Sequence, residues 1–236
     1  MRSILITGNK GFIASGLHGD GIDIKDGIDI VSYRATRKYE VVIHTAAKTS
    51  VTESMKDPKA YVRTNLVGTL NMLLEHPESH FVYLSTAGVY GEGEFHTVKY
   101  SVPNPSSIYA STKLAGEFLI RNLAKSWTIL RLTNVIGDED RGEANVYQVF
   151  RKADVLPIYG DGFQSRDFIR VEKVREAINY VVKNNICGTY NVGSGHSKTI
   201  LQVADEFKKP IQFFPAREGE INRFGIADAF DYSSES

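Results

Sequence analysis

Cysteine is almost absent from this sequence, which has one, Cys187, among 236 residues. A single cysteine excludes an intramolecular disulfide and any metal site built from several thiolates, and the six histidines match no metal-ligand spacing. We therefore expect no metal, and we interpret Cys187 as a small buried apolar residue ahead of Gly188.

Neither sign of charge is in excess, because 28 Lys and Arg residues balance 28 Asp and Glu residues. The chain therefore has no excess of positive charge that would favour a nucleic-acid partner. No apolar run is long enough to cross a bilayer, and we find no secretory signal pattern. These absences lead us to expect a cytoplasmic protein with neither a nucleic-acid nor a membrane partner.

The chain does contain alternating strand and helix patterns. Nearly continuous apolar runs that end in turn residues predict strands, whereas apolar residues spaced three and four apart predict helices. Strands that are apolar throughout are typical of a parallel sheet covered on both faces. We predict strands at 2–7, 21–24, 41–44, 80–84, 127–132 and 188–192, helices at 12–17, 60–75, 109–125, 147–153, 171–183 and 200–208, and a glycine-rich loop at 157–166.

A glycine-rich turn follows the first predicted strand. Residues 7–14 read Thr-Gly-x-x-Gly-x-x-Ala and connect that strand to a brief helix. Gly8 and Gly11 would let the backbone approach a pyrophosphate, and the start of the helix offers unpaired N–H groups to it. Ala14 is small enough for close packing of the helix. This pattern predicts a dinucleotide-binding turn, and an ordinary strand-to-helix turn is the alternative.

The end of the second predicted strand carries an acidic residue, Asp23. A carboxylate at this place can accept both ribose hydroxyls of an adenosine and repel a 2′-phosphate, which favours NAD over NADP. Lys10 and Lys25 are near it in the sequence and leave NADP open. A surface Asp in a turn is an equally good interpretation of this residue alone.

Tyr109 and Lys113 lie four residues apart in a predicted helix, so they share one face. A free tyrosine has a pKa of about 10, and lowering it to about 7 requires about 4 kcal/mol. One cation at about 4 Å in a partly buried site supplies roughly that amount. Tyr109 is therefore a candidate general acid and base with Lys113 as its partner. On spacing alone, a Tyr and a Lys four residues apart more often indicate an ordinary helix with a solvent-exposed face.

Eight motifs together resemble the extended short-chain dehydrogenase/reductase family, in particular its NAD-dependent sugar-nucleotide epimerase/dehydratase branch, which includes UDP-glucose 4-epimerase. The motifs occur in the family's order, and the resemblance extends from residue 1 to about residue 220. No single motif is specific, but the set is. They occupy residues 7–14, 44–47, 65–69, 85–91, 109–113, 131–137, 166–169 and 190–195.

The resemblance implies an α/β fold, a Rossmann-type doubly wound parallel sheet with a small C-terminal substrate-binding lobe. We place the NAD-binding domain at residues 1–136 and the smaller substrate-binding lobe at 137–236, with 188–193 as a strand that returns to the main sheet. The first helix and the second crossover are much shorter than the family norm, which weakens the expectation of adenine binding. The chain also lacks the family's usual C-terminal extension, so the substrate lobe could be more open.

The resemblance also implies roles for individual residues. Thr86, Tyr109 and Lys113 take the catalytic positions, and the hydroxyl of Thr86 can donate or accept a hydrogen bond as a sugar C–O bond changes order. Thr86, Asn134, Arg166, Arg217 and Glu220 would bind substrate, the arginines at its phosphates. The residues implied in cofactor binding are Gly8, Lys10, Gly11, Phe12, Ile13, Asp23, Ala46, Ala47, Lys48, Asn65, Ser85, Tyr109 and Lys113.

One departure from the family bears on the reaction. Its dehydratases and decarboxylases place acidic residues directly after the catalytic Thr, to move a proton at a neighbouring carbon, whereas this chain has Ala87 and Gly88. Neither residue can carry a proton, which argues against those reactions.

We therefore expect an NAD-dependent epimerase that acts on a nucleotide-diphosphate sugar through a transient 4-keto intermediate. An NAD(P)H-dependent reductase of a 4-keto sugar nucleotide is the second hypothesis, and a non-catalytic nucleotide-sensing protein is the third. By resemblance, the helices at 60–75 and 109–125 would pair across a homodimer as a four-helix bundle. The sequence identifies neither the sugar nor the nucleotide base.

Overall fold

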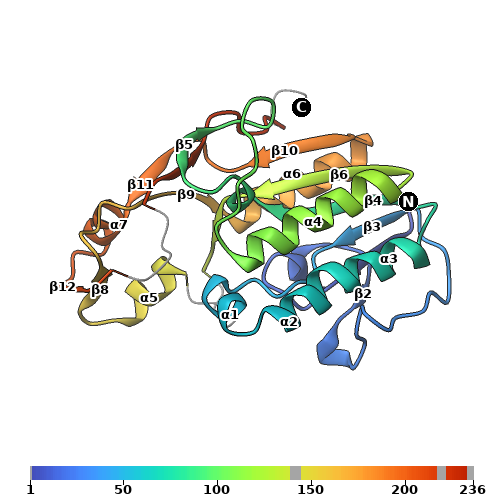
Figure 1. Ribbon diagram of the computed structural model, residues 1–236, viewed down its shortest axis with the longest axis horizontal. Helices are drawn as coiled ribbons and strands as arrows, with labels where there is room; N and C mark the ends of the chain where they lie inside the picture. The colour runs from blue at the N-terminus through green and yellow to red at the C-terminus, as the bar shows by residue number, and fades with distance from the viewer. Residues whose placement is uncertain (1, 139–144, 217–221, 233–236) are drawn as a thin grey trace.

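A six-stranded parallel sheet forms the centre of the computed structural model, which describes residues 2–138, 145–216 and 222–232. The strand order is β10-β6-β4-β3-β1-β2. The carboxyl ends of these strands point toward the smaller part of the molecule (Figure 1). The strands are β1 (Ile4–Thr7), β2 (Asp20–Ile22), β3 (Val41–His44), β4 (His80–Thr86), β6 (Ser126–Leu132) and β10 (Gly188–Val192).

Helices cover both faces of the sheet. In front of it in Figure 1 lie α3 (Thr69–Glu75) and α4 (Ile108–Leu123), and behind it lies α6 (Val171–Asn184). Because the strands alternate their side chains between the faces, each face has its own apolar core. One core joins β-strand side chains to α3 and α4, and the other joins them to α6. The predicted Rossmann-type doubly wound fold is confirmed.

The first two crossovers are short, as expected. A 3₁₀ turn, η1 (Ala14–Gly16), stands where a full helix would follow β1, and a second, η2 (Ile24–Asp26), follows β2. The chain then returns directly to β3 on the other side of β1. The sheet therefore ends at β2, where a Rossmann sheet of order 3-2-1-4-5-6 has one more strand.

The single helix predicted at 60–75 is in fact a composite. After α1 (Val51–Lys56), a run of α2 (Pro58–Tyr61), a π-helix η3 (Val62–Gly68) and α3 follows without a break in helical backbone angles. Thr69 Oγ1 donates to the carbonyl of Asn65 at 2.6 Å inside the wide turn. A π-helix adds a residue to the turn and so changes the direction of the side chains within it.

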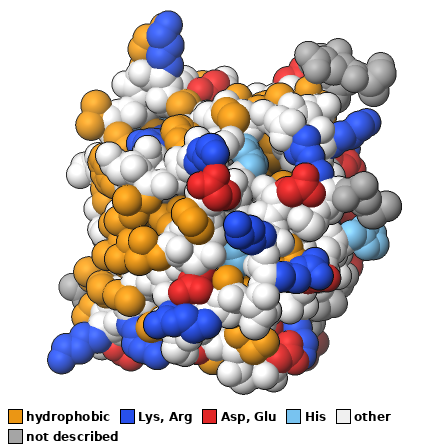
Figure 2. Space-filling view, turned by 90° about the vertical axis from the view of Figure 1, so that its right-hand side faces the viewer, with side chains coloured by type: hydrophobic (Ala, Val, Ile, Leu, Met, Phe, Trp, Pro, Cys, Tyr) orange, Lys and Arg blue, Asp and Glu red, His pale blue; other side chains and the backbone are white. Residues whose placement is uncertain are grey.

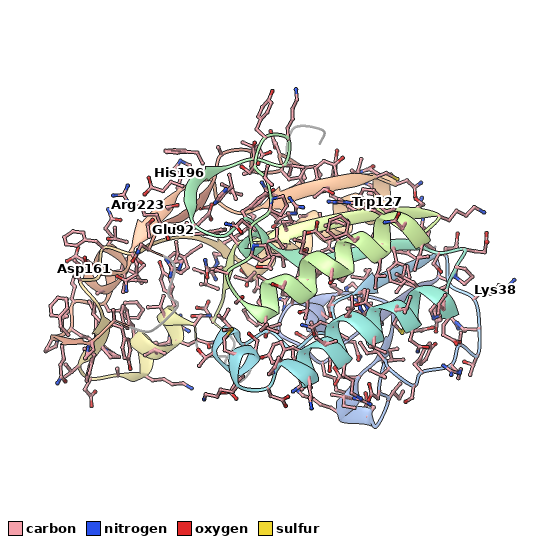
Figure 3. All side chains as sticks on the ribbon, in the orientation of Figure 1. Lys38, Glu92, Trp127, Asp161, His196 and Arg223 are labelled. Carbon is pink, nitrogen blue, oxygen red and sulfur yellow. The ribbon has the colours of Figure 1, made fainter. Side chains whose placement is uncertain are left out.

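The smaller part of the molecule consists of short elements. The helices α5 (Val146–Lys152) and α7 (Ile200–Phe207) pack together on a separate apolar cluster. Beside them are the sheets β11-β9-β7 and β12-β8. Figure 3 shows Asp161 in this part, at the opposite end of the long axis from Trp127 and Lys38. The strands are β7 (Asn134–Ile136), β8 (Leu156–Tyr159), β9 (Ser165–Arg170), β11 (Ser197–Thr199) and β12 (Ile211–Phe214).

Two sequence predictions are wrong in this half of the chain. Residues 157–166 do not form only a loop, because most of β8 and the start of β9 fall within them. Each of these strands pairs with a strand distant in sequence, so the local pattern does not reveal it. Cys187 is exposed rather than buried.

The return of the chain to the main sheet is confirmed, since β10 pairs in parallel with β6. Helix α6 also packs on that sheet, although it follows residue 137 in sequence. The domain boundary at 136/137 stays a prediction. Over the described residues, no helix is both long enough and apolar enough to cross a membrane. The remaining elements, η4 (Ala87–Tyr90), β5 (Gly93–His96) and β13 (Phe224–Ile226), lie beyond the end of β4, and β5 pairs with β13.

Candidate active site

The glycine turn after β1 is tightly packed against the loop that follows β3. Gly8 has a φ of +68°, and a Cβ on it would lie 2.8 Å from the Cα of Ala46. Its N–H donates to the carbonyl of Ile22 at 2.7 Å, and the N–H of Gly11 donates to the carbonyl of Gly8 at 2.9 Å. A side chain at Gly8 would therefore be strained and would clash. The bare backbone forms a cradle that fits a dinucleotide pyrophosphate.

Asp23 is 6% exposed and holds the glycine turn to β2. Its two carboxylate oxygens accept from the N–H groups of Lys10, at 3.0 Å, and Lys25, at 2.9 Å. Each oxygen keeps a further lone pair, so the carboxylate could also accept from a ribose hydroxyl. The side chain of Lys10 forms an ion pair with Asp26. The roles of Asp23 and Lys10 in cofactor binding stay predictions.

An arginine from α6 supports the shortened turn from the other side. Arg175 donates to the carbonyls of Phe12, at 2.8 Å, and Ile13, at 2.9 Å. A Cβ on Gly16 would lie 2.6 Å from this guanidinium, so a larger residue there would displace the Arg175 side chain. No local pattern points to Arg175, because it is 162 residues away from Ile13.

Asn65 orders the loop after β3 rather than projecting from it. Its Oδ1 accepts from the N–H of Lys48 at 2.8 Å, and its Nδ2 donates to the carbonyl of Lys48 at 2.9 Å and to Thr112 Oγ1 at 3.1 Å. Its side chain therefore fixes the backbone beside Ala46 and Ala47, the predicted cofactor contacts. Direct contact of Asn65 with a cofactor stays a prediction.

A buried histidine connects the same loop to the glycine turn. His44 Nδ1 lies 2.8 Å from Thr7 Oγ1, and its Nε2 lies 2.9 Å from Thr69 Oγ1. Thr7 Oγ1 also accepts from the N–H of Ala46 at 3.1 Å. Burial, with a smaller contribution from the charge of Lys113, lowers the pKa of His44 to about 3, so its ring is neutral at physiological pH.

The three predicted catalytic residues come from two adjacent elements. Thr86 ends β4, and Tyr109 and Lys113 lie one turn apart on α4, whose first turn is capped by Ser107. Gly88 lies between the two elements, since a Cβ on it would lie 3.2 Å from Thr86 Oγ1 and 3.8 Å from the Cβ of Ala110. The end of β4 therefore packs beside the first turn of α4. This packing brings the hydroxyl of Thr86 to the end of the helix that carries the phenol.

Lys113 is buried, and its ammonium is directed at the sheet. Its Nζ donates to the carbonyl of Leu84 at 2.6 Å and lies 4.6 Å from the ring centroid of Tyr83. Burial lowers the pKa of Lys113 to about 7, and the charge of Glu117 acts in the opposite direction. Ser85, predicted to contact the cofactor, donates to Glu117 at 2.6 Å, and its cofactor contact stays a prediction.

Two of the predicted substrate residues, Asn134 and Arg166, lie in the β11-β9-β7 sheet. Asn134 donates to the carbonyl of Asp167 at 3.2 Å, and Arg166 donates to the carbonyl of Ser165 at 2.7 Å. The buried carboxylate of Asp167 accepts from Ser194 and Gly195, among others, and so holds the loop after β10. Arg217 and Glu220 lie outside the described residues.

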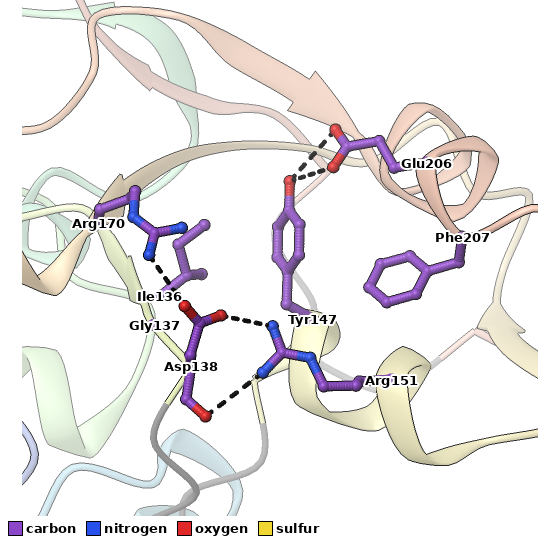
Figure 4. A pocket seen from close by; sticks show the side chains of 8 residues that line it. All are labelled: Ile136, Gly137, Asp138, Tyr147, Arg151, Arg170, Glu206 and Phe207. Atoms are coloured by element: carbon purple, nitrogen blue, oxygen red, sulfur yellow. Dashed lines mark hydrogen bonds and ion pairs between the residues drawn. The ribbon is translucent and has the colours of Figure 1, made fainter.

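A pocket of about 250 Å³ lies at the base of the smaller part, between β7, α5, β9 and α7 (Figure 4). Asp138 binds Arg151 at 2.9 Å and Arg170 at 3.2 Å across it, and these arginines lower the pKa of its carboxyl group. These two ion pairs connect Asp138, which follows β7, to α5 and to the end of β9. In the part of the chain that the structure describes, we find no group of three or more His, Cys, Asp or Glu residues that could hold a metal.

Comparisons with known proteins agree with this geometry. A family model described as "NAD dependent epimerase/dehydratase family" matches residues 18–193. A Methanocaldococcus jannaschii protein assigned as a UDP-glucose 4-epimerase is 33% identical over 93% of this chain and 78% of its own length. A dTDP-glucose 4,6-dehydratase of Xanthomonas campestris is 31% identical over 89% of this chain, which spans only 66% of that enzyme.

Solved structures give the same picture. The UDP-glucose 4-epimerase of Thermus thermophilus in complex with NAD has a TM-score of 0.84 and 27% identity, with 96% of this chain and 90% of that chain covered. A UDP-glucuronic acid 4-epimerase mutant of Bacillus cereus, in complex with a fluorinated UDP-sugar and NAD, has a TM-score of 0.86 and 26% identity, with 98% and 90% covered.

Proposed function

Because the chain belongs to the NAD dependent epimerase/dehydratase family, we propose that it is an NAD-dependent epimerase of a nucleotide-diphosphate sugar. The reaction would pass through a transient 4-keto sugar. UDP-glucose is the first substrate to test, since relatives of this chain are named for their action on it.

The absence of an acid behind Thr86 is the observation that favours epimerisation over dehydration. Ala87 is fully buried, and a Cβ on Gly88 would lie 3.2 Å from Thr86 Oγ1. The N–H of Gly88 donates to that same oxygen at 3.1 Å. Tyr109 would therefore move a proton at one sugar oxygen, whereas residues 87 and 88 offer no second acid for the neighbouring carbon.

In the mechanism that we propose, Tyr109 as phenolate takes the proton of the sugar hydroxyl and later returns it to the ketone oxygen. The ammonium of Lys113 favours the phenolate by its charge. Thr86 would hold the reacting oxygen by a hydrogen bond in both states. NAD, when bound, supplies the hydride chemistry that these side chains lack.

The cofactor would lie over the glycine turn. The cradle at Gly8 and the carboxylate of Asp23 at the end of β2 suit a pyrophosphate and an adenosine ribose. The backbone that Asn65 orders, at Ala46 and Lys48, would line the middle of the dinucleotide. Arg166 and Asn134 would bind the substrate, with Arg217 at its phosphates and Glu220 at its nucleoside. We also propose a cytoplasmic location, as the sequence patterns lead us to expect.

The test is an assay of the purified chain with UDP-glucose and a panel of other sugar nucleotides, combined with mass spectrometry of released ligands. We expect bound NAD and a 4-epimer formed without added cofactor. Stoichiometric loss of NADPH absorbance would instead favour the reductase. Cofactor binding with no turnover across the panel would favour a nucleotide-sensing protein.

We further propose a homodimer formed through the outer face of α3 and α4. Figure 2 shows hydrophobic side chains gathered along its left side, where this helical layer lies. Helix α4 packs beside both η3 and α3, so their outer faces are continuous. A continuous exposed apolar face is typical of an interface. The residues that form it are Val62, Val67, Leu74, Phe118 and Leu123, each between 42% and 64% exposed.

Light scattering of the wild type at micromolar concentration should give about twice the chain mass of 26.3 kDa. Phe118→Glu should reduce it to one chain mass, because a charge would be buried without a partner. Phe163→Glu, at an exposed phenylalanine in the smaller part, is the matched control and should leave the dimer intact. A wild type of one chain mass would reject the dimer.

A further inference from the structure

Three titratable side chains follow one another along one face of α4 at intervals of four residues: Tyr109, Lys113 and Glu117. Lys113 is 3% exposed and Glu117 is 0% exposed, so a buried cation and a buried anion lie one turn apart. The proposed mechanism uses the first two residues and leaves Glu117 without a role. A buried ion is costly unless it is paired, so the partners of Glu117 decide what it can do.

The charge of Lys113 depends on its surroundings. Its contacts with the carbonyl of Leu84 and the ring of Tyr83 replace only part of its hydration. Burial brings its pKa down to about 7, and Glu117 opposes that effect. The neighbouring groups on β3 and β4 carry no negative charge at neutral pH, since burial lowers the pKa of His44 and raises that of Tyr83. Lys113 is therefore close to losing the proton that its partnership with the phenol requires.

The carboxylate of Glu117 is fixed by four hydrogen bonds. Arg131 on β6 binds it with Nε at 2.9 Å and Nη2 at 2.6 Å. Arg121 on the next turn of α4 donates at 3.0 Å, and Ser85 on β4 donates at 2.6 Å. Arg131 in turn lies 4.8 Å from the ring centroid of Tyr90 on η4. These donors come from three elements and fix the carboxylate in place, one helical turn from Lys113.

We propose that Glu117 is a positioning residue, which keeps Lys113 in its ammonium form beside Tyr109. The carboxylate does not touch the reacting atoms and acts through Lys113. The consequence for turnover rests on the proposed function, whereas the effect on Lys113 itself does not.

The direct test follows the titration of Lys113 by NMR in the full chain with isotope-labelled lysine, using the chemical shift of Cε. The resonance is identified by its absence in Lys113→Met. In Glu117→Gln we expect the midpoint to move to lower pH by about one unit or more, because a nearby opposite charge shifts a pKa by about that amount. Glu117→Asp keeps the charge and should recover most of the wild-type midpoint.

A second variant predicts a shift of opposite sign. Arg121 is partly exposed, so Arg121→Gln removes a cation from the same carboxylate without emptying the core. The charge of Glu117 then acts on Lys113 with less compensation, and the midpoint should move to higher pH. A purely structural role for Glu117 predicts no shift of the Lys113 midpoint in folded Glu117→Gln. If Glu117→Gln does not fold, Arg121→Gln decides alone, and a midpoint in it equal to or below that of the wild type overturns the proposal.

The pH profile of turnover links this effect to the reaction. The alkaline limb, where Lys113 loses its proton, should move to lower pH in Glu117→Gln and in the same direction as the NMR midpoint. Should the wild type turn over no sugar nucleotide while the midpoint still shifts, the proposed function fails and the positioning role stands. An unchanged Lys113 midpoint in folded Glu117→Gln overturns the positioning role whatever the activity.

Discussion

Helix α4 and the glycine turn after β1 differ in what holds them in place. Helix α4 has 16 residues, a side-chain cap at Ser107 and a buried ion cluster at Glu117. The glycine turn is followed by only three residues of 3₁₀ helix, and its carbonyls are bound by Arg175 from a distant helix. Both regions would serve one reaction. Helix α4 is held by its packing in the core, whereas the glycine turn is held by hydrogen bonds from a side chain of α6.

This difference reflects what each region has to do. An ammonium acts more strongly on a phenol where the local dielectric constant is low. The burial of Lys113 between α4 and the sheet provides such a site. A pyrophosphate needs only backbone N–H groups that can be approached closely, so a short turn is sufficient if something keeps its shape. We infer that the first crossover could be shortened because Asp23 and Arg175 replace the support of a full helix.

The largest effect is expected in the α4 region. Tyr109→Phe removes the proposed acid and base and should lower kcat by about a hundredfold to ten-thousandfold, the usual contribution of such a group. The measurement is a steady-state assay on the best sugar nucleotide of the panel. Tyr100→Phe, at a tyrosine that is 76% exposed, is the matched control and should retain wild-type kcat. Substantial activity of Tyr109→Phe on every accepted substrate would show that Tyr109 is not the acid and base of the reaction.

The next effect concerns acid stability and the buried His44, which binds Thr7 ahead of the glycine turn. Above about pH 6.5 this histidine is neutral in both the folded and the unfolded state. As the pH falls, the unfolded chain gains a proton there that the folded chain, with a pKa of about 3 caused by burial and Lys113, does not. Stability is therefore lost as the pH falls from about 6.5 to about 3.

Between pH 7 and pH 4 this histidine should account for about 3 kcal/mol of the lost free energy of unfolding. Urea unfolding at several pH values should show a shallower acid slope in His44→Gln than in the wild type. His18→Gln, at an exposed histidine, should keep the wild-type slope. Equal slopes in all three proteins would mean that His44 does not titrate as its burial requires.

The smallest effect is expected from loss of Arg175, which supports the glycine turn. Arg175→Met removes two hydrogen bonds to the carbonyls of Phe12 and Ile13. We expect about tenfold weaker NAD binding, or about 1.4 kcal/mol, with little change in kcat at saturating cofactor. Calorimetry with NAD measures this, and Lys173→Met on the same helix is the control. If Arg175→Met lowered kcat instead, the glycine turn would affect the chemical step as well as cofactor binding. Helix α4 and the turn would then not differ in their roles.

Local patterns revealed most of the main sheet but little of the smaller part. The central strands are buried on both faces, so their apolar runs stand out, and β10 was expected to return to the sheet. In contrast, β8 and β9 alternate in exposure, contain Pro157 and Arg166, and pair with strands far along the chain. The π-helix does not show in the period of its own sequence, and Asn65 within it binds Lys48, which is 17 residues away.

The sequence alone determined the α/β sheet, the short crossovers and the spacing of Tyr109 and Lys113, because these follow from local periodicity and turn chemistry. The tertiary structure alone decided that Lys113 and Glu117 are both buried, that Arg131 forms an ion pair with the carboxylate, and that Arg175 supports the turn. Burial and ion pairing join residues from separate elements, and a linear pattern does not say which distant partners a folded chain brings together.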